Sequence, residues 1–179
     1  AQVFDFSDRR RVVDVGGGLG TLLVEVLRAW PHLAGTLFDR AGVIEQARAR
    51  FNGLSDLDGR VDTVAGDFLA AVPQGADIYV IKHVLHNWGD DAARRILANC
   101  VDGVADGGRV LVIEGVVLPG DAPDGTRLLD LEMLALCKGG YERSKPAFRR
   151  LFAEAGLRIE SSRPLAGGAR LLVGAPLAR

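Results

Sequence analysis

The sequence is poor in cysteine and histidine, the residues on which disulfide frameworks and most zinc sites depend. Its 179 residues include only two cysteines and three histidines. Cys100 and Cys137 both fall in segments with helical spacing and apolar neighbours, so we expect two free, buried thiols in a reducing, cytoplasmic setting. Their spacing to the histidines matches no zinc motif, and the sequence therefore predicts no metal site.

A strong charge of either sign and long hydrophobic runs are also missing. The chain has 22 Lys and Arg against 23 Asp and Glu, a net charge of -1, which argues against nucleic acid or an anionic membrane as a partner. No apolar run approaches the roughly 20 residues that cross a bilayer. Because 48% of the residues are hydrophobic, we expect one domain with a substantial core.

Strand and helix patterns alternate along most of the chain. Strands are expected at 11–15, 35–38, 61–65, 77–82 and 109–114, and helices at 21–30, 43–51 and 90–104. This order predicts a parallel sheet with helices on both faces. Helices are then expected at 126–136 and 144–155, before strands at 157–161 and 169–174 whose short link makes them antiparallel neighbours. Residues 121–125 are the best candidate for a loop.

The first predicted strand runs into a glycine-rich loop, Gly16-Gly17-Gly18-Leu19-Gly20. Glycines let a backbone turn sharply and approach a ligand, and the following helix offers free N–H groups. Asp39 closes the next strand, where a carboxylate can accept hydrogen bonds from ribose hydroxyls. These features predict a nucleotide-like ligand. Thr21 interrupts the dinucleotide pattern G-x-G-x-x-G, so a nicotinamide-dependent oxidoreductase is the less favoured alternative.

The strand expected at 77–82 ends in an unusually polar segment, Lys82-His83-Val84-Leu85-His86-Asn87-Trp88. In open α/β sheets, ligands bind at the carboxyl ends of the strands. A histidine there can act as a base at neutral pH, and Glu114, which ends the neighbouring strand, is placed to orient it. His83 is expected to be structural, because a continuing strand would direct its side chain to the other face.

Several ordered motifs resemble those of one enzyme family. Asp14-Val15-Gly16-Gly17-Gly18-Leu19-Gly20, Leu37-Phe38-Asp39 and Gly66-Asp67-Phe68 are similar to the first three motifs of Rossmann-like S-adenosylmethionine-dependent methyltransferases. The stretches 82–88, 113–119 and 139–144 resemble the plant caffeate and the bacterial polyketide and hydroxyneurosporene O-methyltransferases. The resemblance covers nearly the whole chain. It implies an α/β fold with a seven-stranded, mostly parallel sheet, an antiparallel last strand and helices on both faces.

The resemblance also implies an activity and a set of site residues. The activity is transfer of a methyl group from S-adenosylmethionine to a hydroxyl of a small aromatic or polyketide-like molecule, which leaves S-adenosylhomocysteine. His86 would be the general base, flanked by Glu114 and Glu142, with Asn87 (where the family commonly has Asp) and Met133 on the acceptor side. The implied cofactor contacts are Asp14, Gly16, Gly17, Gly18, Asp39, Arg40, Gly66, Asp67, Phe68 and Lys82.

The family's catalytic region normally follows a helical N-terminal region that dimerises and covers the acceptor site. The sequence has no counterpart to it, so we expect residues 1–179 to be the cofactor-binding catalytic domain of a homodimeric parent. Two alternatives remain open: a cofactor-binding module without turnover, and a hydroxylase of related fold. The sequence does not identify the acceptor.

Overall fold

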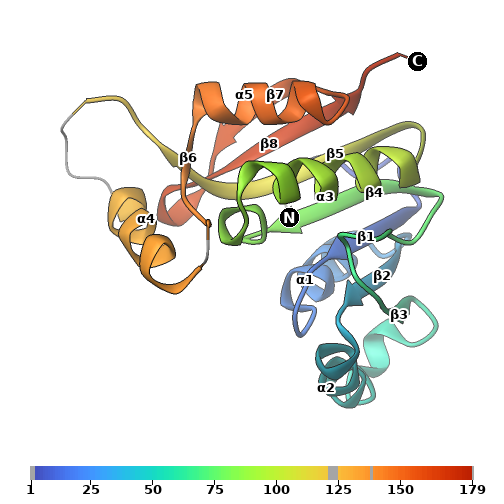
Figure 1. The fold of residues 1–179 in the computed structure, drawn as a ribbon. Helices are drawn as coiled ribbons and strands as arrows, with labels where there is room; N and C mark the ends of the chain where they lie inside the picture. The colour runs from blue at the N-terminus through green and yellow to red at the C-terminus, as the bar shows by residue number, and fades with distance from the viewer. Residues whose placement is uncertain (1–2, 121–124, 138, 179) are drawn as a thin grey trace.

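The computed structural model describes residues 3–120, 125–137 and 139–178, which form an α/β fold around one central sheet (Figure 1). The strands are β1 (Arg11–Val15), β2 (Ala34–Asp39), β3 (Val61–Ala65), β4 (Ala76–Lys82), β5 (Val104–Val117), β6 (Arg143–Ser144), β7 (Leu157–Pro164) and β8 (Ala169–Pro176). The helices are α1 (Thr21–Ala29), α2 (Ala41–Phe51), α3 (Asp90–Gly103), α4 (Gly125–Leu136) and α5 (Lys145–Glu154). Short 3-10 turns occur at Ser55–Leu57, Leu85–Asn87 and Ala166–Gly168.

The sheet has the strand order β3-β2-β1-β4-β5-β8-β7, and the two-residue β6 pairs with β5 off this path. The strands β1 to β5 are parallel to one another, whereas β8 is antiparallel to both β5 and β7. The predicted seven-stranded sheet with an antiparallel last strand is therefore confirmed, with β6 as an addition. β8 lies between β5 and β7, and it is antiparallel to β7 because the short link after β7 allows only a reversal of direction.

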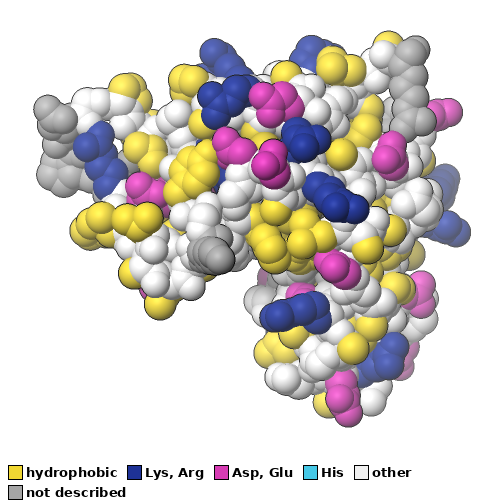
Figure 2. All heavy atoms as spheres, in the orientation of Figure 1, with side chains coloured by type: hydrophobic (Ala, Val, Ile, Leu, Met, Phe, Trp, Pro, Cys, Tyr) yellow, Lys and Arg dark blue, Asp and Glu magenta, His cyan; other side chains and the backbone are white. Residues whose placement is uncertain are grey.

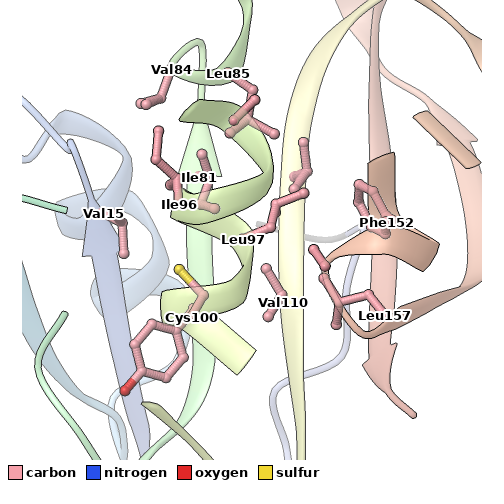
Figure 3. Close-up of a cluster of buried hydrophobic side chains, with 14 of the residues drawn as sticks. Val15, Ile81, Val84, Leu85, Ile96, Leu97, Cys100, Val110, Phe152 and Leu157 are labelled. Carbon is pink, nitrogen blue, oxygen red and sulfur yellow. The ribbon is translucent and has the colours of Figure 1, made fainter. Parts of the chain in front are cut away.

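Helices cover both faces of the sheet, and each face has its own core. Successive strand residues alternate between the faces. Val13 therefore lies in the core formed with α3 and α5, whereas Val12 lies in the core formed with α1 and α2. Figure 3 shows the first core, where Leu97 and Cys100 of α3 pack over the strands. Burial on both faces explains why the strand residues of β4, Ile78 to Ile81, are all apolar.

Some boundaries differ from the sequence prediction. β5 is longer than expected at both ends, because it begins directly after α3 and continues past Glu114 to Val117. Ser144 does not belong to α5 but caps it, with its hydroxyl accepting a hydrogen bond from the Ala147 N–H. The expected loop at 121–125 lies outside the described residues except for Gly125, which begins α4.

The expectation of two buried thiols is wrong for one of them. Both cysteines are free; Cys100 is fully buried in α3, whereas Cys137 lies just beyond the end of α4 and is only partly buried. The apolar neighbours of Cys137 favoured burial, yet α4 buries little more than Thr126 and Met133.

The outer face of α4 is apolar and exposed. Leu128, Leu131 and Leu134 follow one another at intervals of three residues and are 72%, 64% and 75% exposed. Hydrophobic side chains are visible on this part of the surface in Figure 2. Among the described residues, no helix is long and apolar enough to span a membrane.

Candidate active site

The carboxyl ends of β1, β2, β3, β4 and β5 bring most of the predicted site residues to one edge of the sheet. The parallel register aligns Val15 with both Phe38 and Ile81, and Lys82 with Ile113. Each strand therefore ends at a similar height, and the segments that follow them lie next to one another. This is the edge at which open α/β sheets bind ligands.

The glycine loop after β1 is shaped by contacts that exclude side chains. Gly16 has a φ of 67° and donates its N–H to the Phe38 carbonyl at 2.8 Å. A Cβ on Gly17 would lie 2.5 Å from the Asp14 carboxylate and 2.6 Å from Leu37. Gly20, with a φ of 74°, precedes α1 and provides no side-chain cap for the first N–H groups of this helix.

Asp39 supports this loop from the neighbouring strand. Its Oδ2 accepts the Gly18 N–H at 2.9 Å, and its Oδ1 accepts the Arg40 N–H at 2.7 Å. Each carboxylate oxygen has a second lone pair, so Asp39 can accept further hydrogen bonds from a ligand. The Arg40 and Lys82 side chains are exposed at the same edge.

Asp14 is the buried acidic group beneath the loop. Its Oδ2 has no hydrogen-bond partner among the described residues. Burial, together with the charge of Asp39, raises the pKa of Asp14 to about 7, against the opposing influence of Lys82. A buried carboxyl with one unpartnered oxygen, below a loop with no room for a side chain at Gly17, is the arrangement expected of a polar ligand site.

Gly66, Asp67 and Phe68 follow β3 on the other side of the loop. A Cβ on Gly66 would lie 2.5 Å from the Phe38 ring, so only glycine allows this segment to approach β2. Asp67 is exposed and accepts the Leu69 N–H at 2.8 Å. The Phe68 ring lies edge-to-face with Trp88, with 5.8 Å between ring centroids, and forms an apolar wall beside the loop.

Two glutamates flank His86, and they do different things. Glu142 Oε1 lies 2.7 Å from His86 Nδ1, a charge-assisted hydrogen bond. Glu114 Oε1 accepts the N–H groups of Val84 and Leu85 at 3.0 and 2.8 Å, and its Oε2 lies 3.7 Å from His86 Nδ1. Glu142 therefore orients the imidazole directly, whereas Glu114 fixes the turn that carries it.

The same contacts set the pKa values of His86 and Glu114. Burial lowers the pKa of His86, but the hydrogen bond that its Nδ1–H donates to Glu142 and the charges of Glu114 and Glu142 outweigh it and leave that pKa raised above 6.5. Burial is the main cause that raises the pKa of Glu114 to about 7. Because Nδ1 is committed to Glu142, Nε2 is the nitrogen of His86 that can accept a proton.

His83 does not point away from the site, and the sequence-based expectation for it is wrong in its geometry. β4 ends at Lys82, and His83 adopts a φ of 52°, the only positive φ among the non-glycine residues described. This turn brings its ring to 5.4 Å from the His86 ring and its Nδ1 to 3.9 Å from Glu114 Oε2. Burial, Lys82 and His86 lower the pKa of His83 against the opposing charge of Glu142, which favours the neutral form of this imidazole.

Ligating atoms of His83, His86 and Glu114 lie within 4.8 Å of one another, a grouping that could hold a cation. His86 Nδ1 and Glu114 Oε1 are, however, already engaged in the hydrogen bonds described above. We interpret the group as a hydrogen-bonded base, and the absence of a metal site stays a prediction.

The predicted acceptor-side residues meet at the end of α4. The Asn87 Nδ2 donates to the His83 carbonyl at 3.2 Å, and its Oδ1 lies 3.2 Å from the thiol of Cys137. Met133 is buried one helical turn before Cys137, with 4.0 Å between their sulfur atoms. Asn87 thus connects the His86 turn to α4, a role that its amide fills without any charge.

Arg143 is a residue that the sequence reasoning missed. It is 1% exposed and donates to the carbonyls of Leu85 and Trp88 and to the carboxylate of Asp90. The available signal was its position next to Glu142. A fully buried arginine needs several acceptors around it, and the turn that carries His86 supplies them.

Comparisons with known proteins identify a family and several relatives. A family model described as an O-methyltransferase domain matches residues 1–158. The mitomycin biosynthesis 6-O-methyltransferase of Streptomyces lavendulae is 42% identical over 168 residues, which are 94% of this chain and 47% of that protein. The aclacinomycin 10-hydroxylase RdmB of Streptomyces purpurascens is 41% identical over 167 residues, 91% of this chain and 44% of that protein.

A solved structure gives the same result in three dimensions. CalO1, a methyltransferase in calicheamicin biosynthesis crystallised in its SAH-bound form, matches with a TM-score of 0.90 and 41% identity over 98% of this chain and 51% of that chain. The chain thus spans about half the length of the relatives it matches. Since the family model covers most of the sequence and the solved structure has the same fold, this protein belongs to the O-methyltransferase domain family.

Proposed function

We propose that this domain binds S-adenosylmethionine and serves in methyl transfer to a hydroxyl of a small aromatic or polyketide-like molecule, with His86 as the general base. The observation that carries the proposal is the hydrogen bond of 2.7 Å between His86 Nδ1 and Glu142 Oε1 at the ligand-binding edge of the sheet. A histidine held by a carboxylate has a fixed tautomer and a stabilised imidazolium.

The residues of the loop edge fit the cofactor. Asp14 has an unpartnered buried oxygen, Gly17 has no room for a side chain, and Asp39 has spare lone pairs. We expect the glycine loop to accept the methionine part, Asp39 and Arg40 the ribose, and Asp67 and Phe68 the adenine, with Lys82 nearby. When bound, S-adenosylmethionine supplies an electrophilic methyl group on a sulfonium centre.

Residues of this chain would accept the proton of the acceptor hydroxyl. The acceptor hydroxyl gives its proton to His86 Nε2 as its oxygen becomes nucleophilic, and the imidazolium that forms keeps its Nδ1–H on Glu142. Glu114 holds the backbone of the His86 turn through its two N–H bonds. A phenol with a pKa of about 10 needs such a base at neutral pH.

Cofactor binding can be tested on this chain alone by isothermal titration with S-adenosylhomocysteine. We expect saturable binding, and Asp39→Ala should weaken it. The absence of binding by a folded chain would contradict the cofactor assignment.

The role of His86 needs a separate measurement. In the natural protein, His86→Gln should lower methyl transfer to a panel of phenolic acceptors by about a hundredfold or more, whereas His32→Gln, far from the site, should not. Methyl transfer by His86→Gln at the unaltered rate would rule out general-base catalysis.

The same assay distinguishes the alternatives. Product mass separates a methylated product from a hydroxylated one, which matters because one relative is named a 10-hydroxylase. Cofactor binding with no product would favour a binding module without turnover. The family match does not favour a nicotinamide-dependent oxidoreductase.

A further inference from the structure

We propose that Arg143 is a positioning residue that holds the His86 turn against Glu142 and so sets the basicity of His86. The inference rests on the proposed role of His86 as the base. Arg143 touches neither the glycine loop nor the imidazole in the described contacts, so any effect on the base must pass through the turn.

The guanidinium of Arg143 holds the backbone on both sides of His86. Its Nη1 donates to the Leu85 carbonyl at 2.8 Å, and its Nη2 donates to the Trp88 carbonyl at 2.7 Å. These two residues enclose His86 within the 3-10 turn Leu85–Asn87 and its C-terminal neighbour. One planar group therefore fixes the beginning and the end of the segment that carries the base.

The orientation of the guanidinium is itself fixed. Its Nε donates to Asp90 Oδ1 at 3.0 Å, and the Tyr141 hydroxyl donates to the same oxygen at 2.5 Å. The Tyr141 ring lies beside the guanidinium, 4.4 Å from its carbon atom to the ring centroid. The three acceptors lie around a rigid fork of donors, a geometry that an arginine can satisfy and a lysine cannot.

Consecutive residues thus hold the ring and its backbone. Glu142 binds the imidazole, and Arg143 binds the carbonyls on either side of it. The segment is anchored in turn, because Glu142 donates its N–H to Asp130 and Arg143 pairs with Val116 of β5. The distance between His86 and Glu142 therefore depends on Arg143 as well as on the two residues that define it.

The sign of the effect on His86 separates positioning from simple charge. Removing a nearby positive charge would raise the pKa of His86, since the imidazolium would meet less repulsion. Loosening the turn would instead weaken the bond to Glu142 and lower that pKa. Among the residues that the structure describes, the other charged or titratable groups that face His86 are Glu114 from β5 and His83 after β4, and both are retained in every variant below.

The experiment is an NMR titration of the three histidine side chains in this chain, with His32 as an internal reference. Arg143→Lys keeps the charge and loses the fork, while Arg143→Met loses both. We expect the pKa of His86 to fall in Arg143→Lys, while in Arg143→Met the loss of the positive charge opposes this fall. The signals of His32 serve as the unchanged reference. Arg150→Met is the matched control, because Arg150 also contacts Asp90, at 3.3 Å, but is exposed and binds neither carbonyl in the described contacts.

A second variant covers the case in which Arg143 variants fail to fold. Tyr141→Phe leaves Arg143 and Asp90 in place and changes no charge at neutral pH, but it removes the hydroxyl that holds Asp90 Oδ1, and it should lower the pKa of His86 by a smaller amount. An unchanged or raised pKa of His86 in folded Arg143→Lys, or in Tyr141→Phe if the former does not fold, would overturn the proposal.

Cofactor binding keeps this outcome separate from the proposed function. We expect Arg143→Lys to bind S-adenosylhomocysteine with a dissociation constant within about twofold of the unaltered chain, a change below 1 kcal/mol, because Arg143 contacts Leu85, Trp88 and Asp90 and not the glycine loop. In the natural protein, kcat should fall about tenfold to a hundredfold with little change in the acceptor KM, as for a misplaced catalytic group. Failure of every form to bind the cofactor would contradict the proposed function without affecting the His86 titration.

Discussion

The Nδ1 atom of His86 lies 2.7 Å from Oε1 of Glu142, although the two residues are 56 positions apart in the chain. Glu114 is also close to this nitrogen, but at 3.7 Å it makes no hydrogen bond to it. The sequence analysis expected both carboxylates to flank His86, but the two have different contacts. Glu142 acts on the imidazole, and Glu114 acts on the backbone that carries it.

Replacing Glu142 by Gln should weaken the base. The hydrogen bond and the charge that raise the pKa of His86 would both be reduced, so this pKa should fall, and the acidic limb of the pH–rate profile should move to lower pH. The maximal rate of methyl transfer should fall by about tenfold to a hundredfold. Glu160→Gln is the control, because Glu160 on β7 pairs at 2.6 Å with Arg109, which lies five residues before Glu114 on β5 and away from His86. An unshifted acidic limb in Glu142→Gln would contradict the assignment.

Variants of Glu114 should separate its structural contribution from its charge. Glu114→Ala leaves the buried N–H groups of Val84 and Leu85 without their acceptor, at a cost of about 1–3 kcal/mol for each. Glu114→Gln retains an acceptor oxygen and should lose much less stability. Urea denaturation of both variants measures this difference, and equal stabilities would show that the two N–H bonds contribute nothing.

Asp14 should make the stability of the fold depend on pH. Its pKa is about 7 in the folded chain against 3.8 for an unperturbed aspartate, so the folded state binds more protons between these values. The stability present at low pH is therefore lost as the pH rises from about 4 to 7. Asp14→Asn removes this contribution, and the loss of unfolding free energy between pH 4 and pH 8 should shrink by on the order of 3 kcal/mol.

Asp62→Asn is the control for this measurement, since Asp62 is exposed on β3. Glu114, whose pKa is also raised to about 7, contributes a change of the same sign and is present in both variants. An Asp14→Asn chain with the same pH dependence as the unaltered chain would refute the prediction.

Two glycine-to-alanine substitutions should have opposite effects. Gly17→Ala places a methyl group 2.5 Å from the Asp14 carboxylate and should cost about 1–3 kcal/mol while weakening S-adenosylhomocysteine binding. Gly42→Ala, in α2, meets open space and should stabilise the helix by about 0.5–1 kcal/mol. Thermal unfolding and calorimetric titration provide the comparison, and a Gly17→Ala chain that binds as tightly as the unaltered one would argue against this loop as the cofactor site.

The two thiols should differ in reactivity. Cys100 is fully buried and burial raises its pKa, whereas Cys137 is partly exposed beside Asn87. A thiol reagent should therefore modify one cysteine in the folded chain and the second only after unfolding. Cys137→Ser should abolish the fast reaction, and a remaining fast thiol would mean that α3 opens readily.

Much of the fold follows from local pattern. The order of strands and helices, the glycine loop and the antiparallel final pair were predicted because hydrophobic periodicity and short links act over a few residues. The prediction for His83 was wrong because it assumed that β4 continues, whereas a positive φ turns the chain directly after Lys82. The expectation that Cys137 is buried was wrong because apolar neighbours in the sequence do not reveal which side of α4 and of the residues after it is covered.

The sequence by itself determined which chemical groups arrive at the edge of the sheet, since parallel strands carry whatever follows them to the same side. Only the tertiary structure decided how these groups are paired. The contact between His86 and Glu142, and the hold of Arg143 on the Leu85 and Trp88 carbonyls, join segments more than fifty residues apart. Such contacts depend on the packing of α4, β5 and β6 around the turn, and no local pattern in the sequence encodes that geometry.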